Sequence, residues 1–212
     1  MVASLSLSTM KDKWKWIGNS SGTFSVGSLK TQMNKDYDNS RNFCMRWCKW
    51  VPAKCNILIW RAEFDRIPTK VALIKRRVML ESDVCSMCND GPKLSKHLFT
   101  SYEVSYRAWL SIRKWFKLPH FILFSIRDIL TLYETANMDK RKADILHGIM
   151  IMACWCMWKA RNEKVFNKKD YAADRIFGDS RSFGFIWLKH RSKHKALSWN
   201  NWCNYPLYMM DL

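Results

Sequence analysis

The sequence ILHGIMIMACWCMW, residues 145–158, is the longest apolar run in a chain of 212 residues. A bilayer takes about 20 consecutive apolar residues to cross, so this shorter run predicts a helix buried in a protein core. The surrounding helical pattern, from Asp139 to Phe166, is the longest in the chain. His147 lies within the apolar run, and we expect it to be a hydrogen-bonded core histidine rather than a metal ligand.

The segments outside this run predict a mainly α fold. Tryptophans alternate with lysines at 13–16, a Gly/Ser loop follows, and residues 23–26 are again partly apolar, so we expect a small N-terminal β-hairpin. Short helices around a C-x-x-C…H knuckle are expected next, and then a C-terminal helical segment. The expected divisions are a knuckle domain at 12–116, a helical segment with a basic end at 120–196, and a tail at 197–212.

The charge balance indicates a polyanionic partner. The chain has 36 Lys and Arg against 18 Asp and Glu, which gives a formal net charge of +18. An excess of this size favours nucleic acid or an anionic membrane surface. A basic protein with no such partner, or one piece of a longer chain whose other parts carry the acidic residues, is the alternative. We expect RNA or DNA as the partner and no membrane.

Two basic runs supply the predicted nucleic-acid contacts, IKRR at 74–77 and KHRSKHK at 189–195. A solvated helix end explains the second run nearly as well. Trp47, Trp50 and Trp60 are candidates for stacking on unpaired bases, although a tryptophan in an amphipathic helix is more often part of a core. The predicted nucleic-acid-binding residues are Lys75, Arg76, Arg77, Lys189, Arg191, Lys193 and Lys195.

Eight cysteines raise the question of the redox compartment. The first ten residues, MVASLSLSTM, lack the positive start and sustained apolar core of a secretory signal. We therefore expect an intracellular protein, in the nucleus or cytoplasm, whose cysteines are reduced thiols or metal ligands.

Three residues have the spacing of a zinc knuckle: Cys85, Cys88 and His97. A tight C-x-x-C turn can bring both sulfurs onto one ion, and zinc prefers four tetrahedral ligands of thiolate and imidazole type. The closing position, five residues after the histidine, is Tyr102, and a phenol with a reference pKa of about 10 is a poor zinc ligand. A distant cysteine could replace it, or the C-x-x-C pair could be a coincidence in a cysteine-rich chain.

The order of motifs resembles the zinc-binding domain at the C-terminal end of plant non-LTR (LINE-type) retrotransposon reverse transcriptases. The shared pattern is W-x-W, GTFSV, the run WVPAKCNILIWRAEFDRIPTKVALIKRR at 50–77, CSMC, HLF and a downstream Trp, which together span about Asp12 to Trp115. The segment CWCMWKARNEKVF at 154–166 resembles what commonly follows in these elements. The resemblance implies that Cys85, Cys88 and His97 are the first three zinc ligands, with Tyr102 in the place of the last, a cysteine.

We therefore expect an accessory, nucleic-acid-associated domain of a reverse transcriptase polyprotein, with no catalytic residues. A polymerase palm needs paired aspartates that hold two metal ions, and no Tyr/Phe-x-Asp-Asp occurs in the chain. The 18 acidic residues are scattered, so a ribonuclease H is not expected either. The alternative is a helical protein-interaction scaffold, a decayed remnant that binds no metal.

Overall fold

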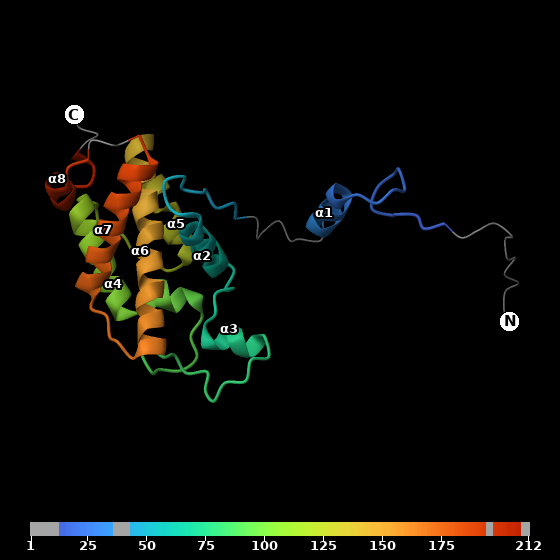
Figure 1. Ribbon diagram of the computed structural model, residues 1–212, viewed down its shortest axis with the longest axis horizontal. Helices are drawn as coiled ribbons and strands as arrows, with labels where there is room; N and C mark the ends of the chain where they lie inside the picture. The colour runs from blue at the N-terminus through green and yellow to red at the C-terminus, as the bar shows by residue number, and fades with distance from the viewer. Residues whose placement is uncertain (1–12, 36–42, 194–196, 209–212) are drawn as a thin grey trace, which may run out of the picture. The chain divides into compact units, whose positions relative to one another are not determined.

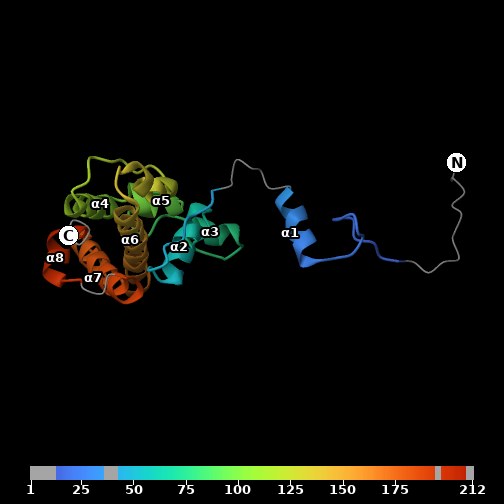
Figure 2. The same cartoon turned by 90° about the horizontal axis from the view of Figure 1, so that it is seen from above.

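The computed structural model describes residues 13–35, 43–193 and 197–208, and it divides the chain into two compact units, 1–44 and 45–212. The described residues are mainly helical, as the sequence predicted. The first unit contains α1 (Val26–Lys35). The second unit is a helical bundle (Figures 1 and 2) made of α2 (Ala53–Glu63), α3 (Lys70–Lys75), the π-helix η2 (His97–Ser101), α4 (Glu103–Phe116), α5 (Ile126–Thr135), α6 (Lys140–Asn167), α7 (Ala173–Arg191) and α8 (Trp199–Asn204).

The predicted N-terminal β-hairpin is wrong: the described residues contain no strand. Residues 13–25 form a loop in which the Trp16 amide donates to the Gly22 carbonyl at 2.8 Å. A two-stranded hairpin is marginal in water unless one face is covered, and here Trp14, Ile17 and Phe24 are all exposed. The second expected strand, 23–26, instead leads into α1, which begins at Val26 and where the Ser25 hydroxyl accepts from the Ser28 amide at 3.1 Å as an N-cap.

Helix α6 is the centre of the second unit. Every residue from Ile145 to Cys154 is buried, which agrees with the core helix predicted from the apolar run. Helices α2, α5, α7 and η2 all pack against α6, and Figures 1 and 2 show it running through the middle of the bundle. A helix that is apolar all round needs neighbours on all sides, which explains this arrangement. No helix in the described part of the chain is long and apolar enough to cross a membrane.

Two glycines allow close contacts with the central helices. A Cβ added at Gly148 of α6 would lie 2.0 Å from the indole of Trp50, whose Nε1 donates to the Asp144 carbonyl at 3.4 Å. A Cβ added at Gly184 of α7 would lie 2.3 Å from Ile149 of α6. Because glycine has no Cβ, Gly148 leaves room for the Trp50 indole, and Gly184 allows α7 to approach α6 closely.

Asn56 fixes the segment that carries Trp50. It is buried in α2, its Oδ1 accepts from the Cys48 amide at 3.0 Å, and its Nδ2 donates to the Cys48 carbonyl at 3.2 Å. Its Nδ2 also lies within 3.4 Å of the carbonyl oxygens of Val51 and Pro52. One buried amide thus satisfies both backbone groups of Cys48, which lies in the segment before α2, as burial requires.

His147 is a core histidine, as expected. Its ring is buried against Tyr133, with ring centroids 4.5 Å apart, and its Nε2–H donates to the Arg46 carbonyl at 2.8 Å. Burial lowers the pKa of His147; the Arg46 carbonyl opposes this shift, while the Arg46 charge adds to it. The neutral imidazole is therefore the form that the fold accommodates.

We predict that Gly148→Ala lowers the free energy of unfolding by about 1–2 kcal/mol, because the new methyl group collides with a rigid buried indole. Gly178→Ala is the matched control: Gly178 is also helical, and a Cβ there meets nothing within 4 Å. That control should gain about 0.5–1 kcal/mol from the better helix propensity of alanine. Urea unfolding measures both changes, and equal effects of the two substitutions would contradict the packing described for Trp50.

We also predict that acid destabilises the protein partly through His147. Its folded pKa lies below the unfolded value of about 6.5, so the unfolded state binds more protons in this range. The stabilisation is complete above that unfolded value and is lost as the pH falls towards the folded pKa. Between pH 7.5 and 5.5 the urea midpoint should fall less in His147→Gln than in the wild type. Glutamine keeps an N–H donor for the Arg46 carbonyl but does not titrate. Parallel decreases in both proteins would show that His147 does not contribute.

Candidate metal centre

Backbone hydrogen bonds close the C-x-x-C segment into a compact turn. The Cys85 amide donates to the Gly91 carbonyl and the Asn89 amide to the Cys85 carbonyl, both at 2.9 Å, and Val84 pairs with Pro92 in an isolated antiparallel bridge. Asn89 and Gly91 both have a φ of 54°, a left-handed conformation that these two residue types adopt readily. This turn brings Cys85 and Cys88 to the same side.

A π-helical turn positions the histidine. The Tyr102 amide donates to the His97 carbonyl at 2.9 Å, five residues back, which is the pattern of η2. Single π-turns often mark functional sites. The turn is anchored on both sides: the Ser95 amide donates to the Asp65 carboxylate at 2.8 Å, and Trp109 Nε1 of α4 donates to the Phe99 carbonyl at 2.7 Å.

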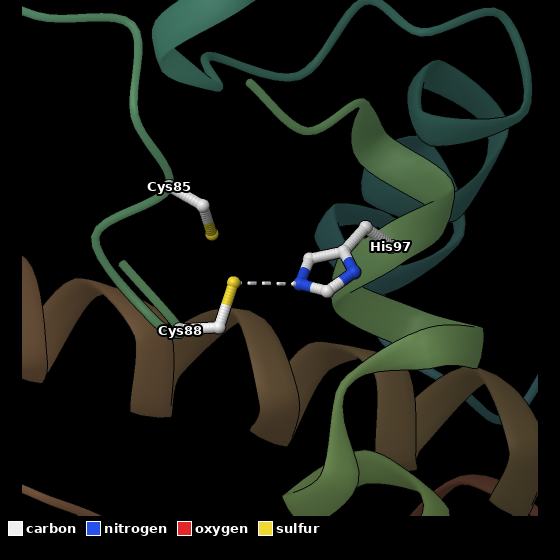
Figure 3. Close-up of side chains that lie close together, drawn as sticks. All are labelled: Cys85, Cys88 and His97. Carbon is white, nitrogen blue, oxygen red and sulfur yellow. Dashed lines mark hydrogen bonds between the residues drawn. The ribbon is translucent and has the colours of Figure 1, made fainter. Parts of the chain in front are cut away.

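The ligand atoms of Cys85, Cys88 and His97 all lie within 4.8 Å of one another. Figure 3 shows the two sulfurs close together beside the imidazole, with Cys88 Sγ 3.4 Å from His97 Nε2. In a tetrahedral zinc site, bond lengths of about 2.3 Å to sulfur and 2.0 Å to nitrogen separate a sulfur and a nitrogen by about 3.5 Å. The residues present therefore fit zinc, and they are the three that the sequence predicted.

The protonation of His97 also suits a metal ligand. Partial burial lowers its pKa, and the nearby Lys93 cation acts in the same direction. The imidazole is therefore neutral near pH 7, the form that can donate a lone pair to a metal ion. Lys93 itself is held by Asp90 in an ion pair of 3.0 Å.

Tyr102 lies at the position of the closing ligand. Its ring is tilted against that of His97, with centroids 6.2 Å apart. Burial raises the pKa of Tyr102, which moves the phenol further from the deprotonated form that could bind a metal. Within the described residues, no fourth Cys, His, Asp or Glu joins the three ligands. Zinc bound here would have three protein ligands and a fourth position for another donor.

Four of the remaining cysteines are core residues in the second unit. These are Cys48, Cys55, Cys154 and Cys156, and all four are buried. Burial raises the pKa of each thiol, and for Cys48, Cys55 and Cys156 it reaches about 12. Thiols of this kind behave as small apolar side chains. They do not supply the distant fourth ligand that the sequence left open.

The C-terminal end of α6 lies against the knuckle. Lys164 Nζ donates to the carbonyl of Met87, inside the C-x-x-C turn, at 3.4 Å, and it forms an ion pair of 2.8 Å with Asp170. Arg161 lines a small cavity of about 40 Å³ together with Cys85 and His97. Arg161 also donates to the Pro68 carbonyl at 3.2 Å. Two cations from α6 therefore lie beside the C-x-x-C turn.

The predicted nucleic-acid residues occupy two places in the second unit. Lys75, Arg76 and Arg77 are exposed at the end of α3, where Arg76 donates to the Arg66 carbonyl at 2.9 Å. Lys189 and Arg191 end α7 and lie over the rings of Phe185 and Trp187. Lys193 is exposed, and Lys195 lies outside the described residues. Their contact with nucleic acid stays a prediction.

The stacking candidates divide by burial. Trp50 is a core residue, so it cannot stack on a base. Trp47 and Trp60 are exposed, and their role remains a prediction.

Comparison with protein families agrees with this geometry. Residues 24–109 match the family model described as zinc-binding in reverse transcriptase, which confirms the resemblance at that level. The family is an accessory domain and not a catalytic one. The match includes Cys85, Cys88 and His97 but ends before α5, α6 and α7. Neither the curated proteins nor the solved structures gave a match.

The sequence-based reasoning missed the contribution of α6 to the site. Arg161 and Lys164 lie more than 60 residues after His97, and spacing alone does not connect them to the knuckle. The available signal was the segment 154–166, which resembles the continuation of the same family and contains both residues.

We predict that Lys164→Met weakens zinc binding about tenfold, because an outer-shell partner of the ligand turn is lost and a cation near the thiolates disappears. Lys169→Met removes the same charge from a nearby exposed position and should leave the affinity unchanged. Competition with a chelating dye measures both affinities. Equal affinities would show that α6 does not support the metal centre.

Proposed function

We propose that this chain is a zinc-binding accessory domain of a reverse transcriptase polyprotein and that it associates with RNA or DNA. The observation that carries the proposal is the convergence of Cys85, Cys88 and His97 in a segment that matches a zinc-binding reverse transcriptase family. The net charge of +18 supports a polyanionic partner. An origin in a plant non-LTR retrotransposon, and a place in the nucleus or cytoplasm, belong to the same proposal.

The role of the metal in this proposal is structural. Zinc held by Cys85, Cys88 and His97 would tie the turn at 84–92 to η2, and these two segments already meet where Cys88 Sγ lies 3.4 Å from His97 Nε2. Zinc supplies folding free energy to small sites of this kind. Fixing the knuckle would also hold the start of α3, because Thr69 and Lys70 line the same small cavity as Cys85.

A helical protein-interaction scaffold is the second candidate, and one surface feature favours it. A groove of about 420 Å³ lies between α4 and the loop that follows it, lined by Trp109, Leu110 and residues 121–124. Ile122 and Phe124 are 62% and 76% exposed. The groove is also lined by Lys96 and Arg113, and exposed large apolar side chains with a polar rim are typical of protein contacts. A scaffold of this kind would not need the metal.

Zinc content of the purified protein tests the proposal. We expect about one zinc per chain in the wild type, since three ligands of the right type converge. Tyr102→Cys should bind more tightly, by more than about tenfold, because a direct ligand contributes more than an outer-shell partner. Tyr102→Phe is the matched control and should leave the affinity unchanged.

The possible results separate the two candidates. A wild-type protein that is empty while Tyr102→Cys fills would mean that this copy has lost its site through one substitution. If both proteins are empty, the metal hypothesis is wrong and the scaffold is favoured.

A further inference from the structure

A groove of about 540 Å³ runs along one side of α6, between α2 and α7. Figures 1 and 2 show α6 with these two helices beside it, and both pack against it. The groove is rich in aromatic rings. Its aromatic residues come from α6 and α7, and they are Trp155, Trp158, Phe183 and Trp187.

Cations lie over the rings of this groove. Lys54 Nζ is 4.9 Å from the ring centroid of Trp155, and Lys159 Nζ is 5.1 Å from that of Phe183. The Arg191 guanidinium is 5.7 Å from the centroid of Trp187. Among the described residues, none of these three cations forms an ion pair with a carboxylate. Their charges are therefore available to a ligand.

The sign of the groove is positive. Glu163 is the one carboxylate among its lining residues, and it accepts a hydrogen bond from Asn167 at 2.9 Å. Lys54 and Arg191 also act on Cys55 at the groove floor, where they oppose the rise in thiol pKa that burial causes. The groove thus combines half-buried ring faces with unpaired cations in a chain of net charge +18.

We propose that this groove is a binding site for single-stranded nucleic acid, an inference that rests on the proposed association with RNA or DNA. Unpaired bases would stack on Trp155 and Trp187, and Lys54, Lys159 and Arg191 would turn from the rings to the phosphates. Aromatic platforms beside a positive groove are how proteins hold single strands without reading their sequence. A duplex keeps its base faces stacked inside, so it cannot use the rings.

Charge and ring content favour this ligand over a protein segment. An acidic peptide would match the cations but would leave the indole faces of Trp155 and Trp187 without a planar partner. A nucleic acid strand supplies both a planar base and a phosphate in each repeat. Lys189 lies over Phe185 on the same helix and extends the positive charge beyond the groove.

The test is fluorescence anisotropy with a labelled 12-nucleotide single-stranded RNA, the corresponding DNA strand and the duplex. Trp187→Ala and Trp155→Ala should each weaken single-strand binding about 5- to 100-fold, and the phenylalanine variants should restore most of it. Trp199→Ala is the matched control. Trp199 begins α8, is exposed, lies beneath the Arg181 guanidinium of α7 and does not line this groove. Lys159→Gln should make the salt dependence shallower by about 0.7 in the log–log slope.

Heparin, a polyanion without bases, separates charge from stacking. Heparin affinity should not change in Trp187→Ala if the ring acts by stacking; an equal loss for heparin and RNA would overturn the inference. Photocrosslinking with 5-iodouridine RNA should place adducts on Trp155 or Trp187. If the wild type binds with a steep salt dependence, but the groove variants have no effect and no adducts form there, the groove is not the binding site. The proposed association with nucleic acid would then still stand. If the wild type binds none of the nucleic acids, the proposed association fails as well.

Discussion

Burial of α6 on all sides is the constraint on which the rest of the second unit depends. Ten consecutive buried residues, from Ile145 to Cys154, leave no face of this stretch for solvent. The surrounding segments must therefore approach closely, and Gly148 and Gly184 allow two of these approaches, because a side chain there would collide with Trp50 or with Ile149. Trp50 sits in the first of these contacts, so the segment before α2 is fixed by the same helix that forms the core.

The same helix connects the core to the candidate metal centre. Its buried part ends near Ala160, and the turns that follow carry Arg161 and Lys164 to the knuckle. The C-x-x-C turn is closed by its own backbone hydrogen bonds and one isolated bridge, and in the described residues it belongs to no helix or sheet. Docking on α6 and coordination by zinc are two ways to order this turn, and each should strengthen the other because both act on the same backbone.

Parts of this architecture could be predicted from the sequence because the signals are local. The core helix follows from a long apolar run, and the grouping of Cys85, Cys88 and His97 follows from their spacing. The hairpin prediction failed although alternating Trp and Lys at 13–16 satisfy the strand pattern: Trp14 is exposed, and Trp16 packs against Phe24 within a loop and not across a sheet. The roles of Asn56, Gly148, Arg161 and Lys164 depend on partners distant in the sequence, which no local period reveals. Tyr102 shows that spacing alone is not enough: it lies at the position of a closing ligand, but a tyrosine does not fit zinc.

The central claim is that the C-terminal end of α6 and the candidate metal centre stabilise each other. Hydrogen exchange tests this coupling most directly. Amide exchange is compared by mass spectrometry in the metal-free and zinc-loaded protein. We expect zinc to slow exchange at residues 84–102 and also at 158–167, the end of α6 that contacts the knuckle. Protection confined to 84–102, or no change anywhere, would contradict this coupling.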